Sequence, residues 1–308
     1  MITRHIRGLV KMTVYDEKTD FKFNKSAVTL GKFDGLHLGH QELIGEVVNE
    51  SRENGYESVL FSFDTSRISS QPSITTRDER CYLAEKYGID NVIFYPVNRD
   101  TMSMEPETFI REILYKKLGA KLIVTGIDFR FGKDRKGDIE TLKKYSEEYG
   151  YEVRVKDNVM VDGEKVSSTV IKKYILDGNV SQAGKMLGLD FFYMGEIVKG
   201  NQIGRTIDSR TANLIPAEEK IIPKYGVYKS ETVIDGVGYK SITNIGLSPT
   251  IRSESYVTVE THILNFDHNV YGKGIVVKLK NFIREERKFA NIDELKRQIL
   301  LDISQANL

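Results

Sequence analysis

Two of the five histidines in this chain stand three residues apart in a segment that reads GKFDGLHLGH, from Gly31 to His40. A helical pattern follows at once, and residues three apart in a first helical turn lie on one face. The glycines allow close approach of the backbone to a ligand, and the start of the helix directs free N–H groups at an anion. We therefore predict a phosphate-binding turn, which is neither a P-loop nor the Gly-x-Gly-x-x-Gly fingerprint. Its candidate residues are Gly31, Phe33, Asp34, Gly35, His37, Gly39 and His40.

Two other roles for these histidines stay open at this point. They could cap the helix or pack in the core, or they could belong to a zinc site. Zinc needs at least a third ligand, and the remaining histidines, His5, His262 and His268, are remote in sequence. The placement of two histidines between glycines in one turn favours the phosphate interpretation.

Two further segments carry residues of the kind that bind anions. The segment from Gly126 to Asp138, GIDFRFGKDRKGD, combines glycines and basic residues with rings that could stack on a planar ligand. Loops of this composition are common, so the segment is weak evidence by itself. Ser167, Ser168 and Thr169 open a helix, and they are preferred N-cap residues. Phosphate binding at the same turn is compatible with capping.

The pattern around these segments indicates a doubly wound parallel sheet. Short apolar runs alternate with helical stretches, which is typical of right-handed βαβ units. Ligands of such sheets bind beyond the carboxyl ends of the strands, where the strand order reverses. With the order 3-2-1-4-5, the three segments follow strands one, four and five and converge on one crevice. The expected strands are Ala27–Leu30, Val59–Phe63, Val92–Tyr95, Leu122–Thr125 and Glu152–Val155, and the expected helices are Gln41–Glu53, Asp78–Tyr87, Pro106–Leu118 and Ile139–Tyr149.

After about Phe191 the pattern changes to strands that alternate every second residue, with hairpin turn chemistry at Asp235-Gly236. This predicts an antiparallel barrel or sandwich, closed by a helix near Ile292–Asn307. We place the domain boundary between Gly184 and Phe191, with one domain over residues 1–187 and a second over 188–308. The expected strands are Tyr193–Val198, Gly226–Val233, Tyr239–Asn244, Tyr256–Phe266 and Ile275–Phe282.

The second half has its own candidate chemistry. Thr211 and Asn213 could hold magnesium and phosphate oxygens in a loop, because Mg²⁺ prefers hard oxygen ligands. The same residue types also make ordinary turns. Glu260 lies in an expected strand, and on the inner face of a barrel it would be a candidate general base. An outer, solvated position is the alternative, and the alternation alone leaves both open.

The composition excludes several classes of protein. The 308 residues suit about two domains, and the formal net charge of +1 offers no footprint for nucleic acid or an anionic membrane. Cys81 is the only cysteine, which excludes an internal disulfide and favours a buried structural thiol. We find neither a signal peptide nor an apolar run of the ~18 residues that a membrane helix needs. We expect a soluble, cytoplasmic protein that acts on small molecules and binds no nucleic acid.

The three segments of the first half resemble the three motifs of the bacterial bifunctional riboflavin kinase/FAD synthetases. The resemblance implies adenylyl transfer from ATP to FMN, which gives FAD and pyrophosphate. It implies that His37 and His40 contact the ATP phosphates and that Ser168, Thr169 and the cationic Lys172 bind phosphate. Relatives usually carry arginine where this chain has Lys172, and lysine loses the bidentate geometry. The flavin end of the site would include Asp128, Phe129, Arg130 and Phe131.

The second half resembles the riboflavin kinase domains of the same family. Their Pro-Thr-Ala-Asn loop and Glu-x-His strand are matched by Thr211-Ala212-Asn213 and Glu260-Thr261-His262. The resemblance implies that Thr211 and Asn213 hold Mg-ATP, with Thr211 as the metal ligand, and that Glu260 takes the proton from the ribityl hydroxyl of riboflavin. Where relatives read Gly-aromatic-Pro, this chain reads Asp208-Ser209-Arg210, which removes a permissive and a rigid backbone position.

That departure keeps three alternatives in view. The chain could be a monofunctional FAD synthetase with an impaired barrel, or a flavin-binding regulator without catalysis. It could also be a nucleotidyltransferase for another phosphorylated acceptor. The paired motifs favour the bifunctional enzyme.

Overall fold

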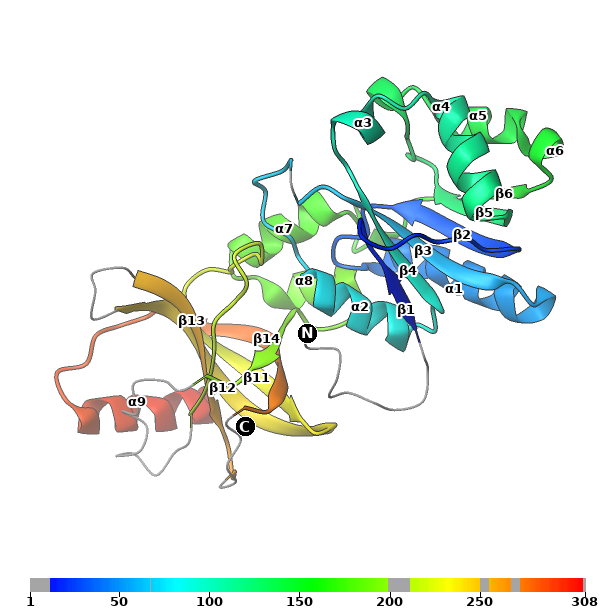
Figure 1. The fold of residues 1–308 in the computed structure, drawn as a ribbon. Coiled ribbons are helices and arrows are strands. Elements are labelled where there is room, and N and C mark those ends of the chain that lie inside the picture. Colours follow the sequence, from blue (N-terminus) through cyan, green and yellow to red (C-terminus); the bar gives the residue numbers. More distant parts are fainter. Residues whose placement is uncertain (1–11, 67, 199–210, 250–254, 267–271, 307–308) are drawn as a thin grey trace. The chain divides into compact units, whose positions relative to one another are not determined.

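The computed structural model describes residues 12–66, 68–198, 211–249, 255–266 and 272–306. The chain divides into two compact units, one up to Ser168 and one from Thr169 onward. Each unit is described by itself below (Figure 1).

The first unit is built on a six-stranded parallel sheet with the order β1-β4-β3-β2-β5-β6. The five strands that the sequence predicts take the predicted order. The edge strand β1 was not predicted, because three residues carry too little periodicity, and it pairs with β4. The strands are β1 Thr13–Tyr15, β2 Ser26–Gly31, β3 Glu57–Asp64, β4 Asn91–Pro96, β5 Ala120–Gly126 and β6 Glu152–Lys156.

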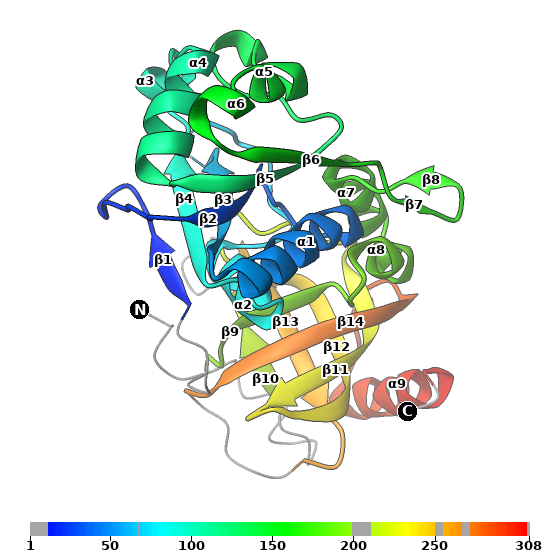
Figure 2. The ribbon, with the colours of Figure 1, turned by 90° about the vertical axis from the view of Figure 1, so that its right-hand side faces the viewer.

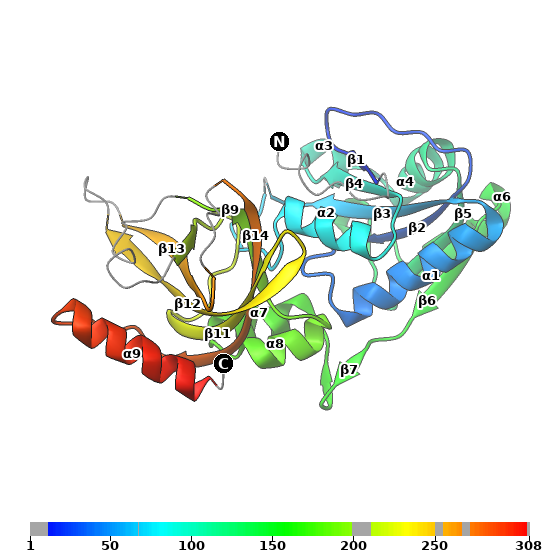
Figure 3. The same cartoon turned by 90° about the horizontal axis from the view of Figure 1, so that it is seen from below.

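Helices cover both faces of this sheet. Helices α1 and α2 lie on one side and α3 and α4 on the other (Figure 3). The apolar stripe of α1 is buried as predicted, whereas the expected helix from Pro106 turns π-helical after its first turn and the one from Ile139 breaks at Tyr145. The helices are α1 Leu38–Asn54, α2 Arg77–Lys86, α3 Arg99–Met102, α4 Pro106–Phe109, the π-helix Ile110–Lys117, the 3-10 turn Lys133–Arg135, α5 Ile139–Lys144 and α6 Ser146–Tyr149.

A small hairpin and two helices complete this region of the sequence. Strands β7 (Met160–Val161) and β8 (Glu164–Lys165) form a hairpin that projects away from the sheet (Figure 2). Helix α7 (Ser168–Leu176) begins at the point where the two units divide, and α8 (Val180–Leu187) packs on strand β14 of the second unit.

The second unit is an antiparallel barrel with the strand order β10-β13-β12-β11-β14-β9. A bridge between Val198 and Asn213 joins its two edges, so the sheet is a nearly closed barrel and not a sandwich. Thr211 to Leu214, which we expected as a loop, is strand β10. The strands are β9 Phe192–Glu196, β10 Thr211–Leu214, β11 Gly226–Ile234, β12 Val237–Pro249, β13 Ser255–Ile263 and β14 Gly274–Arg284.

The interior of the barrel is partly polar. Five fully covered hydroxyl side chains form a hydrogen-bonded ladder with O–O distances of 2.8–2.9 Å across β11, β12 and β13. Its members are Ser230, Thr232, Ser241, Thr243 and Thr261. The predicted turn at Asp235-Gly236 has φ of 50° and 82°, as a two-residue hairpin loop requires. Outside the strands, α9 (Ile292–Gln305) is held by the bidentate pair of Arg284 with the buried Asp302.

Two candidate active sites

The first candidate site is the turn from Gly31 to His40, which joins β2 to α1. The backbone is strained here, because Phe33 and Leu36 have φ of 51° and 42° although neither is glycine. Such residues cost on the order of 1–3 kcal/mol each and persist only where the surroundings hold them. Both side chains are completely buried, so they anchor the turn in the core.

Polar contacts from remote segments hold the same turn. The carboxylate of Asp34 accepts hydrogen bonds from the backbone N–H groups of Ile74 (2.7 Å) and Thr75 (3.2 Å). The N–H of Gly35 donates to the hydroxyl of Thr75 at 3.0 Å, and the hydroxyl of Ser168 donates to the carbonyl of Asp34 at 2.9 Å. Asp34 and Ser168 therefore meet as the sequence predicts, while the residues at 74 and 75 were missed.

The two histidines lie together at the start of α1. His37 is the N-cap residue and makes no capping hydrogen bond with its side chain, and its ring stacks on that of His40 at 3.7 Å. Burial lowers the pKa of His37 to about 4. Burial, helped by the nearby charges of His37 and Arg80, also lowers the pKa of His40, so both rings are neutral near pH 7.

Several polar atoms at this turn are ready for a ligand. The Nδ1 atoms of His37 and His40 are buried without a hydrogen-bond partner among the residues that the structure describes. The first intrahelical bond is donated by Gln41, so earlier N–H groups of α1 have no partner within the helix. A negatively charged group placed here would meet both imidazoles and the positive end of the helix.

The predicted flavin-binding residues after β5 differ in how far they are exposed to solvent. Asp128 is exposed and pairs with Lys165, whose hydrogen bond lowers the pKa of the carboxyl. Phe129 is half-buried and stacks on Phe63 and Phe131, while Phe131 is only 3% exposed and belongs to the core. Arg130 is exposed and donates to the carbonyl of Phe129. Asp128, Phe129 and Arg130 thus offer surface to a ligand, and the buried Phe131 packs against the ring of Phe129.

The other phosphate residues that we predicted lie at the division between units. Ser168 is the last residue of the first unit, and Thr169 and Lys172 follow on α7 in the second.

Cys81 is buried, and burial raises the pKa of its thiol to about 12, as expected of a structural cysteine.

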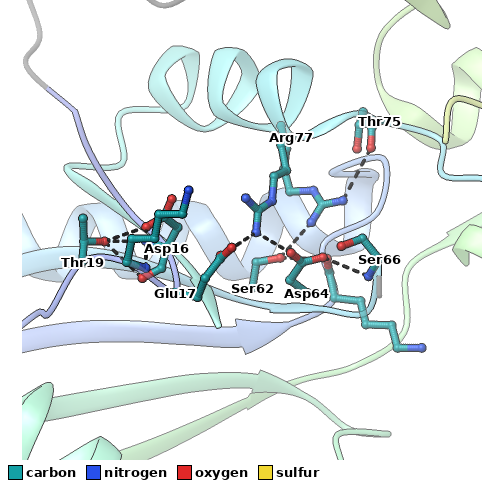
Figure 4. A network of polar contacts seen from close by, with 11 residues as sticks. Asp16, Glu17, Thr19, Ser62, Asp64, Ser66, Thr75 and Arg77 are labelled. Carbon is teal, nitrogen blue, oxygen red and sulfur yellow. Dashed lines mark hydrogen bonds and ion pairs between the residues drawn. The ribbon is translucent and has the colours of Figure 1, made fainter. Parts of the chain in front are cut away.

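Two arginines of α2 take part in polar contacts that the sequence did not reveal (Figure 4). Arg77, at the start of α2, forms ion pairs with Asp64 and Glu17. Arg80, one turn further along α2, donates to the hydroxyl of Ser62 at 2.9 Å. The capping box formed by Thr76 and Glu79 is the sequence signal that could have located the start of this helix.

The second candidate site lies on the barrel around Glu260. The strand register places Glu260 between Asn213 on β10 and Asn244 on β12. Its chain neighbours Val259 and Thr261 are completely buried, so Glu260 points to the opposite, outer face. It is nevertheless half-buried, and desolvation raises the pKa of its carboxyl, with a smaller contribution from the charge of Glu286.

Glu286 was not predicted as part of this site. Its carboxylate accepts a hydrogen bond from Asn244 at 2.9 Å. It also lies against Gly246, where a Cβ atom would stand 1.9 Å from its Oε1. The missing side chain of Gly246 therefore gives Glu286 its place. Asn213 also points to a ligand site beside Glu260, because its Oδ1 atom is buried without a hydrogen-bond partner among the described residues.

Some predictions for the barrel lie outside the described part of the chain. Asp208, Ser209 and Arg210 are among these residues, and the side chain of Thr211 is also outside it. No group of three histidine, cysteine, aspartate or glutamate side chains within the described ranges could hold a metal ion. The predicted His37–His40 pair therefore has no third zinc ligand there. No helix of the described segments is long and apolar enough to span a membrane.

These two sites define a two-domain transferase that handles nucleotides. In the comparison with known families, residues 20–170 match the FAD synthetase family and residues 187–308 match the riboflavin kinase family. The chain belongs to the bifunctional riboflavin kinase/FMN adenylyltransferase family. It phosphorylates riboflavin to FMN and adenylylates FMN to FAD, with ATP as the co-substrate of both reactions.

Individual relatives cover nearly the whole chain. The bifunctional riboflavin kinase/FMN adenylyltransferase of Escherichia coli K12 is 34% identical over 89% of this chain and 90% of its own length. The enzyme of the same name from Listeria monocytogenes is 31% identical over 93% of this chain and 92% of its own length. A crystal structure described as a macrolide-efflux protein from Streptococcus pneumoniae superposes with a TM-score of 0.83 at 30% identity, covering 96% of this chain and 99% of that one.

Proposed function

We propose that the turn from Gly31 to His40 holds the ATP phosphates during FMN adenylylation. The observation that carries this proposal is the stacked pair of His37 and His40, each neutral and each with a buried Nδ1 that lacks a partner among the described residues. A neutral imidazole has one N–H donor, so each ring can donate one hydrogen bond to a phosphate oxygen. Together with Gly39 and the start of α1, they would stabilise the charge that builds up on the phosphates.

The chemistry at this site then needs positioning more than covalent catalysis. A phosphate oxygen of FMN attacks the α-phosphorus of ATP, the bond to the β-phosphate oxygen breaks, and pyrophosphate leaves. Asp34 and Gly35 would keep the turn in place through Thr75. Ser168 and Thr169 with Lys172 would bind phosphate, and Asp128, Phe129, Arg130 and Phe131 would form the flavin side, as the family resemblance implies.

In the barrel, we propose that Glu260 is the general base of riboflavin phosphorylation. Glu260 lies on the outer face and not on the inner face for which we expected this role, but it is half-buried and not fully solvated. Its place between two asparagines and its raised pKa support the role, because a base must be reachable and must have appreciable basicity. Glu260 takes the proton from the ribityl hydroxyl as its oxygen attacks the γ-phosphorus of ATP, and ADP leaves.

We also propose that this reaction depends on Mg²⁺. The Oδ1 atom of Asn213 is buried and has no hydrogen-bond partner in the described ranges, and it is a hard oxygen ligand of the kind that the ion accepts. Mg²⁺ usually takes one or two protein oxygens and completes its shell with water and phosphate. Asn213 and Thr211 would hold the ion, which neutralises charge on the ATP phosphates. Titration of MgCl₂ against riboflavin phosphorylation tests this, and full activity in excess EDTA would contradict it.

The separation of the two roles is tested on the whole chain. Riboflavin and FMN are incubated in parallel with Mg-ATP, for the wild type and for His40→Ala, and the flavins are separated by chromatography. We expect His40→Ala to form FMN from riboflavin at the wild-type rate and to form little FAD from either substrate. Normal FAD formation by this variant would remove the first site from the adenylyl transfer.

We place the boundary of the two catalytic domains at residues 187 and 188, as we expected from the change of periodicity. We also propose that the enzyme acts on small molecules in the cytoplasm and binds no nucleic acid. The nearly equal numbers of basic and acidic residues, 45 and 44, support the last point, because they give no positive footprint for a polyanion.

A further inference from the structure

Arg80 is a buried cation for which the described residues provide no close carboxylate. It is 8% exposed, and its guanidinium donates to two neutral oxygens, the hydroxyl of Ser62 at 2.9 Å and the carbonyl of Thr75 at 3.5 Å. Its Nε atom is buried with no hydrogen-bond partner in the described part of the chain. Burying a charge in this way is costly unless its position serves a purpose.

The oxygens that Arg80 contacts both lead into the motif turn. The hydroxyl of Ser62 donates in its turn to the carbonyl of Lys32 at 3.1 Å. Thr75 accepts from the N–H of Gly35 through its hydroxyl. Arg80 is therefore linked to the turn through Ser62 on one side of Phe33 and through Thr75 on the other. Phe33 is one of the two non-glycine residues of the turn with a positive φ.

A neighbouring arginine on the same helix offers a natural comparison. Arg77 and Arg80 both lie over the ring of Phe94, at 4.8 and 5.6 Å from its centroid. The side chain of Arg77 is 41% exposed and is ion-paired with Asp64 and Glu17 (Figure 4). The charge of Arg80 acts on Asp34 and His40 in the turn and on Asp64 outside it. Among the described residues, Arg80 forms no ion pair with either carboxylate.

We propose that Arg80 is a positioning residue for FMN adenylylation. From beneath the turn it fixes Ser62 and Thr75, and through them Lys32 and Gly35, so that His37 and His40 keep the geometry in which they meet the ATP phosphates. Its charge also adds to the positive potential under the bound phosphates. This inference rests on the proposed role of the turn in ATP binding.

The test uses full-length Arg80→Met, Arg80→Lys and Arg77→Met, assayed with FMN and Mg-ATP. A misplaced catalytic group commonly costs on the order of 10²-fold in rate, so we expect Arg80→Met to lose about 10- to 100-fold in kcat while KM for FMN changes by less than about twofold. Arg80→Lys keeps the positive charge but loses the planar guanidinium that can donate to two oxygens at once. Its kcat should therefore lie between those of Arg80→Met and the wild type. Arg77→Met should keep the wild-type kcat, and all three should phosphorylate riboflavin normally.

Wild-type kcat in Arg80→Met, or an equal loss in Arg77→Met, would overturn the inference. If Arg80→Met does not fold, Ser62→Ala decides, because it keeps the arginine and removes the link to Lys32. A fall in kcat supports the proposal, and an unchanged kcat contradicts it. The variant His40→Ala distinguishes failure of the proposed ATP site from failure of the proposed role of Arg80. Full adenylylation in His40→Ala would refute the site, whatever the arginine variants do.

Discussion

The two candidate sites of this enzyme are built by different means. The turn from Gly31 to His40 is held by partners 30 to 134 residues away, such as Ser62 and Ser168. The site around Glu260 arises from strand register, because Asn213 and Asn244 are its cross-strand neighbours. A strained turn needs a scaffold, whereas a strand site forms with the sheet itself. Remote substitutions should therefore damage the first site, and only neighbouring ones the second.

The largest expected effect separates the two reactions. Loss of a general base typically costs about 10²- to 10⁴-fold, so Glu260→Gln should lower kcat for riboflavin phosphorylation by that amount and leave FMN adenylylation unchanged. Chromatography of the flavins measures both rates. Glu231→Gln is the matched control, because Glu231 also lies on the barrel surface but is paired with Lys278. Equal loss in the control, or none in Glu260→Gln, would contradict the assignment.

The reciprocal change belongs to the first site. Removal of one preorganised hydrogen-bond donor costs about 10²- to 10³-fold, so His37→Ala should lower FMN adenylylation by that order and spare the kinase reaction. Steady-state kinetics with FMN as the varied substrate measure the loss. A variant that loses both activities equally would show that the comparison between independent sites is wrong.

The barrel interior supports the second site through its hydroxyl ladder. Thr243 bonds to both Ser230 and Thr261. Ser230 keeps its bond to Ser241 in Thr243→Val, but the buried hydroxyl of Thr261 loses its partner in the ladder, so the free energy of unfolding should fall by about 1–3 kcal/mol. Urea denaturation measures this change. Thr29→Val in the first unit is the control, because the buried Thr29 hydroxyl has no partner among the described residues. It should be neutral or stabilising, and a larger cost there than at Thr243 would contradict this account.

The smallest expected effect concerns pH. Desolvation is the main cause of the raised pKa of Glu260, and the charge of Glu286 raises this pKa further. Glu286→Gln removes that repulsion and lowers the pKa, so the base stays ionised to lower pH. The acid limb of kcat for riboflavin phosphorylation should therefore move to lower pH. Glu285→Gln is the control, since Glu285 is paired with Lys224 and should leave the limb in place. A shift to higher pH in Glu286→Gln would be the contrary result.

Sequence patterns anticipated the elements whose signal is local. The order of five parallel strands, the buried stripe of α1 and the meeting of His37 with His40 were all predicted and are present. The helix start at Leu38, three residues earlier than expected, follows from the turn itself.

What the sequence could not show depends on contacts between remote segments. Strand β10 contains residues typical of turns, and its pairing with β13 overrides that local preference. Alternation around Glu260 could not say which face was the interior, because the interior carries threonines and serines as well as apolar residues. Arg80 and Glu286 stand in no recognisable motif, and only the folded chain brings them to their sites.

Mixing two damaged chains tests the central claim, that two separate sites act in sequence, most directly. Glu260→Gln and His40→Ala are each incubated with riboflavin and Mg-ATP, alone and together, and FAD is measured by chromatography. We predict that neither variant alone makes appreciable FAD and that the mixture does, because His40→Ala supplies the FMN that Glu260→Gln adenylylates. A mixture that forms no FAD, although both proteins are folded, would contradict the account.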